Sequence, residues 1–437
     1  MKIDIRMYNV GFGDCFLVSL TDSSRKRPYR MLFDCGRLAG SRQTDAAAGE
    51  KTFEAVIDGL INDVRDPADD ISKIDIIVAT HRHRDHIHGF SLQDKWKQVE
   101  VTEVWLPWVE DPQNPFARSL VAKQELLANR AFHALTALRA AGKGSNSQAD
   151  AAIDIAYNST SNAKAMATLQ SGNGFKNTNQ RVRYLPRAGH EPEQLRNEEL
   201  AHVLPKGVIV HVLGPSRDPA TIKLLDPPTG AAYEPLVPAM RSLDDTTPDS
   251  AEVGVPPRPF DAAWVVEAAD YGFAEGEDAS IEKLVTIATL EPLELVYRLD
   301  NAINGTSLVL LVEVGDKKLF FPGDAQWGTW KMMQDNPATW ELLTGTTVYK
   351  VGHHGSHNAT PRKFVDECLS PDTNGVALIS VAPTSYGGGW KNIPLLTLVD
   401  ALKQKTKVEQ TWSDDPTVVA VPYDPHVFST TAKMGRP

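Results

Sequence analysis

The sequence predicts an α/β fold in which two separate strand-rich parts of the chain form one sandwich interrupted by two insertions. Alternating apolar and polar residues, typical of half-buried strands, occur near both ends of the chain. Between them lie a segment rich in Ala, Leu and Lys with helical spacing and then a Pro-rich, acidic segment. We therefore assign 1–110 and 300–437 to the sandwich, 111–205 to a helical basic insertion and 216–300 to an acidic insertion.

The N-terminal part is predicted to contain strands and one helix. Residues 1–20 alternate and break at a glycine turn, which predicts two strands. A third strand is expected at 31–34 and a buried strand at 74–79, whereas 52–63 has the apolar spacing of a helix. The other predicted elements are helices at 117–141, 149–169 and 393–404, and strands at 207–213, 307–314, 317–322, 346–351, 376–382 and within 409–421.

Composition excludes several classes of protein. The 437 residues contain three cysteines, too few for a disulfide scaffold, and the odd number fits a reducing compartment. No run approaches 18 consecutive apolar residues, so we expect a soluble, cytoplasmic protein without a membrane span. The net charge is −11, and 216–300 alone carries 17 acidic and 6 basic side chains. By contrast, 113–190 carries 10 basic and 3 acidic side chains.

The densest polar cluster follows the buried strand at 74–79. Within the six residues 81–86 stand three histidines and one aspartate, namely His81, His83, Asp85 and His86. Imidazole and carboxylate groups suit zinc and other divalent first-row metals. Residues two apart on an extended backbone point the same way, so the first two histidines can bind one ion. A turn after them would direct Asp85 and His86 toward a second ion. A surface cluster or a buried structural histidine is the alternative, which four ligand types in six residues disfavour.

The run His81-Arg82-His83-Arg84-Asp85-His86 resembles the HxHxDH motif of the metallo-β-lactamase superfamily. Four further motifs of that superfamily occur along the chain in the order typical of its members. They are Asn9-Val10-Gly11-Phe12-Gly13-Asp14 with Leu32-Phe33-Asp34-Cys35-Gly36, Asn304-Gly305-Thr306-Ser307 with Phe321-Pro322-Gly323-Asp324, Lys350-Val351-Gly352-His353-His354-Gly355-Ser356, and Ile379-Ser380-Val381 with Ser385-Tyr386-Gly387. The details are most similar to the hydrolase domain attached to bacterial DNA-uptake channels and to phosphorylcholine esterases. The resemblance covers about 1–110 and 300–425.

This resemblance implies a four-layer αββα sandwich with a two-metal cleft at the strand ends. The expected metals are two Zn²⁺ ions, with Mn²⁺ or Fe as alternatives. By resemblance, the first ion is bound by His81 and His83, the second by Asp85, His86 and His354, and both by a bridging Asp324. Asp85 and His353 are the candidate catalytic residues, His353 as a proton donor or a support for the ligands, and Asp34 would orient ligand histidines.

The sequence departs from the family pattern at the first metal site. A further histidine ligand is expected where this chain has Gly214, and a late histidine falls at Gly388. We therefore expect the first site to bind more weakly than the second. The nearest histidines that could replace the missing ligand are His190, His202 and His211, of which His211 has the poorest geometry because three residues along a strand reverse the face.

The predicted function is a dinuclear metal-dependent hydrolase. Two cations lower the pKa of bound water and stabilise a charged transition state. A phosphoester or phosphodiester substrate, such as a nucleic acid or nucleotide, is favoured because the basic insertion would attract phosphate, with Arg181, Arg183 and Arg187 as candidate contacts. Two alternatives stay open: hydrolysis of a C–N, ester or thioester bond, and a binding module that has lost catalysis.

Overall fold

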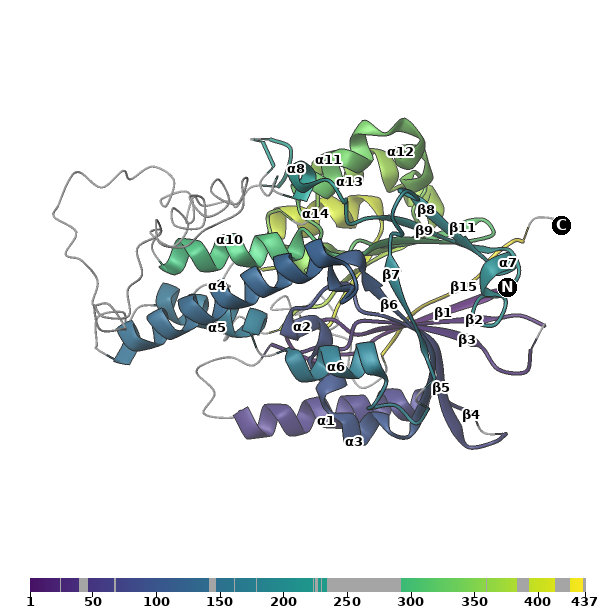
Figure 1. Ribbon diagram of the computed structural model, residues 1–437. Helices are drawn as coiled ribbons and strands as arrows, with labels where there is room; N and C mark the ends of the chain where they lie inside the picture. The colour runs from purple at the N-terminus through teal and green to yellow at the C-terminus, as the bar shows by residue number, and fades with distance from the viewer. Residues whose placement is uncertain are drawn as a thin grey trace.

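Two mixed β-sheets pack face to face in the computed structural model of the chain (Figure 1). The structure describes residues 1–23, 25–38, 46–66, 68–140, 147–160, 162–177, 179–222, 224, 227–228, 230–233, 292–358, 360–382, 393–412 and 425–434. Most of the predicted acidic insertion, the 383–392 region with Ser385, Tyr386 and Gly388, and residues 413–424 lie outside these ranges.

The first sheet is antiparallel at one edge and parallel at the other. Its strand order is β15 (His426–Thr431), β1 (Lys2–Met7), β2 (Phe16–Thr21), β3 (Tyr29–Phe33), β5 (Ile71–Val78), β6 (Val99–Pro107) and β7 (Arg181–Leu185), with β4 (Arg65–Asp66) pairing with β5. The strands from β3 to β7 along this order are mutually parallel, so their carboxyl ends share one edge.

The second sheet has the same mixed character. Its order is β14 (Lys407–Gln410), β13 (Val376–Ile379), β12 (Val348–Lys350), β11 (Lys317–Phe321), β10 (Val309–Val314), β9 (Val208–Gly214) and β8 (Glu193–Arg196). The strands β11 to β14 are parallel, whereas β8 to β11 pair antiparallel. The predicted hairpin at 307–322 is confirmed as β10 and β11.

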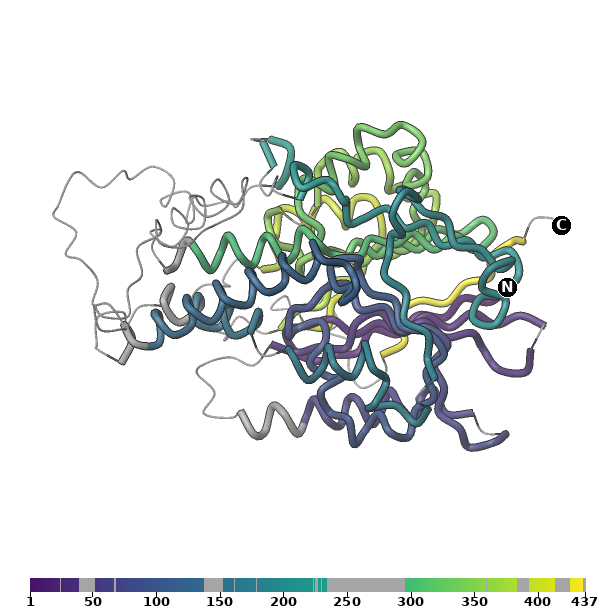
Figure 2. The backbone as a smooth tube through the Cα atoms, viewed as in Figure 1, coloured from purple at the N-terminus to yellow at the C-terminus, as the bar shows by residue number. Residues whose placement is uncertain are grey.

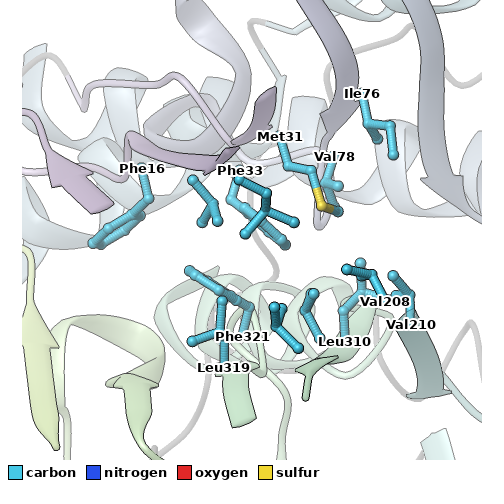
Figure 3. Close-up of a cluster of buried hydrophobic side chains, with 14 of the residues drawn as sticks. Phe16, Met31, Phe33, Ile76, Val78, Val208, Val210, Leu310, Leu319 and Phe321 are labelled. Atoms are coloured by element: carbon cyan, nitrogen blue, oxygen red, sulfur yellow. The ribbon is translucent and has the colours of Figure 1, made fainter. Parts of the chain in front are cut away.

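The core between the sheets follows from the two-residue period of strands. On β10, Leu310 and Val312 face the other sheet, and Val309 and Leu311 face the helices behind. Figure 3 shows the resulting contact layer, in which Phe33 of the first sheet stacks on Phe321 of the second with ring centroids 3.9 Å apart. Both faces of each sheet are therefore apolar, and each sheet needs a further layer of helices to cover its outer face.

Helices cover those outer faces, which gives the layer order α, β, β, α (Figure 1). The first sheet is covered by α1 (Ala46–Asp63), α3 (Gln93–Trp96) and α6 (Ala163–Ser171), and the second by α11 (Trp327–Asp335), α12 (Pro337–Leu343), α13 (Arg362–Cys368) and α14 (Leu396–Lys405). Short helices are α2 (Arg84–Ile87), α7 (Asn197–Leu200) and α8 (Pro219–Ile222), with 3-10 turns η1 (His88–Ser91), η2 (Trp108–Glu110), η6 (Gly352–Gly355) and η7 (Pro371–Thr373). This arrangement is compatible with a metallo-β-lactamase-like sandwich.

Three further helices project from one end of the sandwich (Figure 2). They are α4 (Pro115–Ala140), α5 (Ser147–Thr160) and α10 (Pro292–Asn304). Leu295 and Val296 of α10 pack with Leu135 of α4 and Ile155 of α5. Thus α10, which lies at the C-terminal end of the segment 216–300, joins the helices of the first insertion.

The elements expected from the sequence that fall on described residues have the expected type and differ in extent, whereas β6, β15 and the helices α10 to α13 were not predicted. The helix expected at 149–169 is two helices, α5 and α6, separated near Asn162. The segment 111–205 also contributes β7 and β8, one to each sheet. None of the described helices is both long enough and apolar enough to span a membrane.

Candidate metal centre

Polar side chains gather where parallel strands of both sheets end. Asp34 follows β3, and His81 comes three residues after the end of β5. From the second sheet, Asp324 comes three residues after β11 and His354 four residues after β12. The carboxyl ends of parallel strands are the usual place for a binding crevice in an α/β fold. Here the edges of both sheets contribute to one cluster.

The loops that carry these side chains are joined through their backbones. The Asp14 amide donates to the Asp85 carbonyl at 2.9 Å, and the Gly36 amide donates to the Asp14 carbonyl at 3.0 Å. The Cys35 amide donates to the His86 carbonyl at 2.7 Å. A Cβ atom on Gly36 would lie 2.2 Å from the Asp85 carbonyl carbon, so only glycine allows this approach. This explains why glycines accompany the aspartates in the N-terminal motifs.

Three overlapping groups of buried side chains have the composition of metal sites. Asp14, Asp34 and His86 form one of them, and the other two combine residues of both sheets. Of these two, one is His81, His86 and Asp324, and the other is Asp85, His86 and His354, with the ligand atoms of each group within 4.8 Å of one another. His86 Nε2 lies 3.2 Å from Asp324 Oδ2, although the residues are 238 positions apart in the sequence. His354 Nε2 lies 3.1 Å from Asp85 Oδ2. The two parts of the sandwich therefore converge on one cluster.

His83 lies beside the first group. Its Nδ1 atom is 3.1 Å from His81 Nε2. Burial lowers the pKa of His83 to about 4 and lowers the pKa of His81 well below its usual value. Both imidazoles are therefore neutral at physiological pH, which is the form that binds metal.

Two of the histidines are oriented by hydrogen bonds to their Nδ1 atoms. His86 Nδ1 lies 2.8 Å from Asp34 Oδ2, and Asp34 also accepts from the Thr80 amide at 2.7 Å. His354 Nδ1 lies 2.8 Å from the Ser380 carbonyl. Metal-binding histidines usually donate the ring N–H that faces away from the metal to a carboxylate or a backbone carbonyl. In both residues this leaves Nε2 directed into the cluster, and Asp34 has the orienting position that the resemblance implies.

Asp324 is held through its other oxygen. Its Oδ1 atom accepts from Lys350 Nζ at 3.0 Å and from the His353 amide at 2.8 Å, while Oδ2 faces His86. Lys350 also contacts Asp14 and lies 3.2 Å from the Gly323 carbonyl. Sequence reasoning assigned no role to Lys350 or Asp14, although both stand inside the quoted motifs. Those motifs were the signal that could have identified them.

The buried carboxylates of the cluster outnumber the cationic side chains that face them. Burial alone would lower the pKa of His86, but Asp324, Asp34 and Asp85 raise it well above its usual value. Burial alone would raise the pKa of Asp85, but His86 and His354 lower it. A buried anionic cluster that also offers neutral imidazoles fits divalent cations such as zinc. The donor set present therefore fits the metals that the resemblance implies.

His353 takes no part in these groups. Its backbone is in the left-handed region with φ 45°, its side chain is partly exposed, and its Nδ1 lies 3.0 Å from Ser356 Oγ. Its amide, by contrast, holds Asp324. The strained backbone thus turns the amide toward the cluster and leaves the ring at its rim.

The histidines considered as replacements for the missing first-site ligand lie elsewhere. His211 Nε2 is 3.0 Å from Glu313, His202 Nε2 is 2.8 Å from Glu103, and His190 is exposed in a turn. A Cβ on Gly214 would lie 2.9 Å from Thr329 Cγ2, so a larger side chain at this position would require the Thr329 side chain to shift. We find no support for any of the three as a ligand.

Side chains from the projecting helices contact the metal-motif loop instead. Asn158 of α5 donates to Asp85 Oδ1 at 2.9 Å and accepts from the Asp85 amide at 3.1 Å. His83 Nε2 faces Ser159 Oγ of α5 at 3.3 Å and Asp300 Oδ1 of α10 at 3.5 Å. Nothing in the local sequence of α5 or α10 marks these residues, so sequence reasoning missed them.

The arginines near the motif and on β7 are mostly engaged by glutamates. Arg82 donates to both oxygens of Glu110, at 2.9 and 2.7 Å, and to Glu125 at 3.0 Å. Arg183 pairs with Glu103 and Glu199, and Arg187 with Glu193 and Glu199. Arg181 is exposed at the start of β7, at the edge away from the metal cluster. The basic count of 113–190 therefore overstates the charge available to a substrate.

Comparison of the chain with models of protein families and with curated proteins finds no match. The two mixed sheets and the buried His/Asp cluster at the 81–86 run remain compatible with a metallo-β-lactamase-like fold.

Proposed function

We propose that this chain is a metal-dependent hydrolase that holds two divalent ions, zinc in the first place and Mn²⁺ or Fe as alternatives. One observation carries the proposal: two buried His/Asp groups share His86, and each combines residues that follow strands of both sheets. Structural ion pairs rarely bring neutral imidazoles and several carboxylates to the carboxyl ends of two sheets. Such clusters at strand ends are typical of functional sites.

The proposed ligand assignment follows the resemblance. His81 and His83 would bind the first ion, and Asp85, His86 and His354 the second. Asp324 would serve both ions, and Lys350 and the His353 amide hold its carboxylate in place through Oδ1. Two divalent cations, when bound, supply a water of lowered pKa and stabilise negative charge in the transition state.

His353 is proposed to serve the leaving group. Its ring is at the rim of the cluster, its Nδ1 is held by Ser356, and burial lowers its pKa. Once Nε2 of such a ring has taken up a proton from solvent, the imidazolium can pass that proton to a departing oxygen, and its lowered pKa makes it the stronger acid. Asp85 is proposed to act by adding negative charge at the second ion, beside His354 Nε2, with its own orientation set by Asn158.

For the substrate we propose a phosphoester or phosphodiester, in a nucleotide or nucleic acid. Two-metal sites suit in-line displacement at phosphorus, because the ions stabilise both the attacking and the leaving oxygen. Arg118, Lys123 and Arg130 on α4 are exposed and add positive charge to the projecting helices. Hydrolysis of a C–N, ester or thioester bond is the second candidate, and it is favoured by the pairing of Arg82, Arg183 and Arg187 with glutamates.

The test combines metal analysis with a choice of substrates. The purified protein, loaded with Zn²⁺ or Mn²⁺, is assayed on bis-p-nitrophenyl phosphate, p-nitrophenyl acetate and a chromogenic cephalosporin. We expect metal-dependent hydrolysis of the phosphodiester, lost in Asp324→Asn and retained in His211→Ala, whose histidine is buried but outside the site. Hydrolysis of only the acetate or the cephalosporin would transfer the assignment to the second candidate. A chain that binds metal but hydrolyses none of the three would favour a binding module.

A further inference from the structure

We propose that Asp300, on α10, positions His83 for the first metal ion by accepting the N–H of its Nε2 atom. This inference rests on the proposed metal-dependent function. It adds a site residue that lies outside the quoted sequence motifs, and it makes the projecting helices part of the metal centre.

The two nitrogens of His83 face different parts of the molecule. Nδ1 lies 3.1 Å from His81 Nε2, on the side of the metal cluster. Nε2 lies 3.5 Å from Asp300 Oδ1 and 3.3 Å from Ser159 Oγ, on the side of the projecting helices. Only one of the two nitrogens of a neutral imidazole carries a proton, so the partner of Nε2 decides whether Nδ1 offers a lone pair to an ion.

Ser159 and Asp300 together place the proton on Nε2. The Ser159 hydroxyl donates to the Ile155 carbonyl at 3.3 Å, so toward His83 its oxygen accepts. In its ionised form the Asp300 carboxyl group also accepts, and cations bound beside it would favour that form. Both neighbours of Nε2 are therefore acceptors, which favours the tautomer with a free lone pair on Nδ1.

The Asp300 carboxylate is held in place by its own helix. Asn304, one turn later on α10, donates from Nδ2 to Asp300 Oδ2 at 3.1 Å. The other oxygen is left facing His83. The helix is anchored by Leu299 and Ile303, which pack with Ala128 of α4. Asp300 thus reaches the buried histidine from a fixed element rather than from a loop.

The first metal site has particular need of such a support. Gly214 provides no ligand, and Thr329 and Val309 pack closely around it. With fewer protein ligands, the affinity of the first ion depends more on how well His81 and His83 are oriented. Residues that orient ligand histidines typically change metal affinity about 10–100-fold when they are removed.

The experiment measures metal binding of the full chain with Zn²⁺ in competition with a chromophoric chelator, and records the visible spectrum after loading with Co²⁺. For Asp300→Ala we expect the weaker of two equivalents to lose about 10–100-fold in affinity, while the tighter equivalent stays within about twofold. Asp300→Asn keeps an acceptor oxygen and should lose much less. Ile303→Val is the matched control, because it removes a buried methylene from the same helix without touching a ligand.

The outcomes separate this inference from the proposed function. A wild-type chain that binds neither Zn²⁺ nor Co²⁺ overturns both. A wild-type chain that binds two equivalents, with Asp300→Ala binding both at unchanged affinity, overturns only the role of Asp300. Equal losses in Asp300→Asn and Asp300→Ala would also overturn it, because they would show that the charge, and not the acceptor, is what the site needs. Thermal melts of the three variants establish that each remains folded.

Discussion

Two buried carboxylate clusters of this molecule are built on opposite principles. On β6, Glu103 receives hydrogen bonds from Trp105 and Arg183 on one oxygen, at 2.8 and 2.6 Å, and from Arg183 and His202 on the other, at 3.2 and 2.8 Å. At the metal cluster, Asp14, Asp34, Asp85 and Asp324 share two imidazoles of raised pKa and the Lys350 ammonium. The first cluster is balanced within the protein, whereas the second has an excess of negative charge.

This difference distinguishes a structural ion pair from a cation site. Burial alone would raise the pKa of Glu103, but the hydrogen bonds from Arg183 and Trp105 lower it, so the carboxylate is satisfied as an anion. Burial together with Asp85 and Asp324 raises the pKa of Asp300 well above its usual value, which shows how much negative charge the metal cluster already holds. Buried charge persists only where it is compensated. At the metal cluster, bound cations would supply the compensation that the described side chains lack.

The largest expected effect comes from His86, because both groups of ligands include it. His86→Ala should lower the affinity for both zinc equivalents by about 100-fold or more, and activity should fall with it. Metal content by atomic spectroscopy after dialysis provides the measurement. His211→Ala, which removes a buried histidine paired with Glu313, should retain both equivalents. If the two variants bind equally, the two-group description of the site is incorrect.

The next effect concerns the one ammonium in the cluster. Lys350→Met keeps most of the side-chain volume but leaves Asp14 and Asp324 without their shared cation. Breaking a buried ion pair in this way costs about 3–5 kcal/mol. We expect the metal-free variant to lose about that much free energy of unfolding in urea, and added Zn²⁺ to restore part of it. No loss in the metal-free state would indicate that Lys350 does not compensate these carboxylates.

A smaller effect is expected at the balanced cluster. Glu103→Gln should reduce the free energy of unfolding by about 1–3 kcal/mol at pH 7, because charge-assisted hydrogen bonds from Arg183 are weakened. The pKa of Glu103 is lowered in the folded state, so its stabilisation is complete above the unfolded-state pKa of about 4.3 and declines as the pH falls through the folded-state value.

The difference between wild type and Glu103→Gln should therefore shrink below about pH 4. Urea titrations at several pH values measure it. A difference that stays constant from pH 7 to the acid limit would contradict this account. Metal content should be unchanged in Glu103→Gln, whereas a substitution in the metal cluster should lower it.

The smallest effect is expected at a surface ion pair. Lys331 and Asp335 lie 2.5 Å apart, one turn from each other on α11, and both side chains are about half exposed. Solvent screens such a pair, so Lys331→Ala should change the free energy of unfolding by less than about 0.5 kcal/mol. The same urea titration measures the change. A loss as large as that of Glu103→Gln would mean that burial does not govern the contribution of carboxylates in this protein.

The predicted ligands could be found from the sequence because their signals are local. The run after β5 places His81, His83, Asp85 and His86 within six residues, and the strand before it is apolar throughout. Asp324 and His354 stand in short motifs after strands of the second sheet. The structure brings these residues together, while their binding of metal remains a prediction.

Charge was the property that sequence counting judged least well. Residues 113–190 carry an excess of basic side chains, yet Arg183 and Arg187 pair with Glu103, Glu193 and Glu199, all of which lie outside that segment. The net charge counted along a segment predicts its surface potential only if the charged side chains that pair with it belong to the same segment. Here the partners lie on β6, β8 and α7, outside the segment that was counted.

By itself, then, the sequence determined many of the strands, such as β1, β5 and β10, and the residue types that follow the strand ends, because periodicity and short motifs depend on neighbours along the chain. Only the tertiary structure decided that Lys350 would hold Asp324, that Asn158 would orient Asp85 and that Asp300 would face His83. In α5 and α10 the helical period specifies the apolar side, and a polar residue there acquires its partner only when the helix packs. Contacts between side chains more than two hundred positions apart, such as His83 and Asp300, have no local pattern from which they could have been predicted.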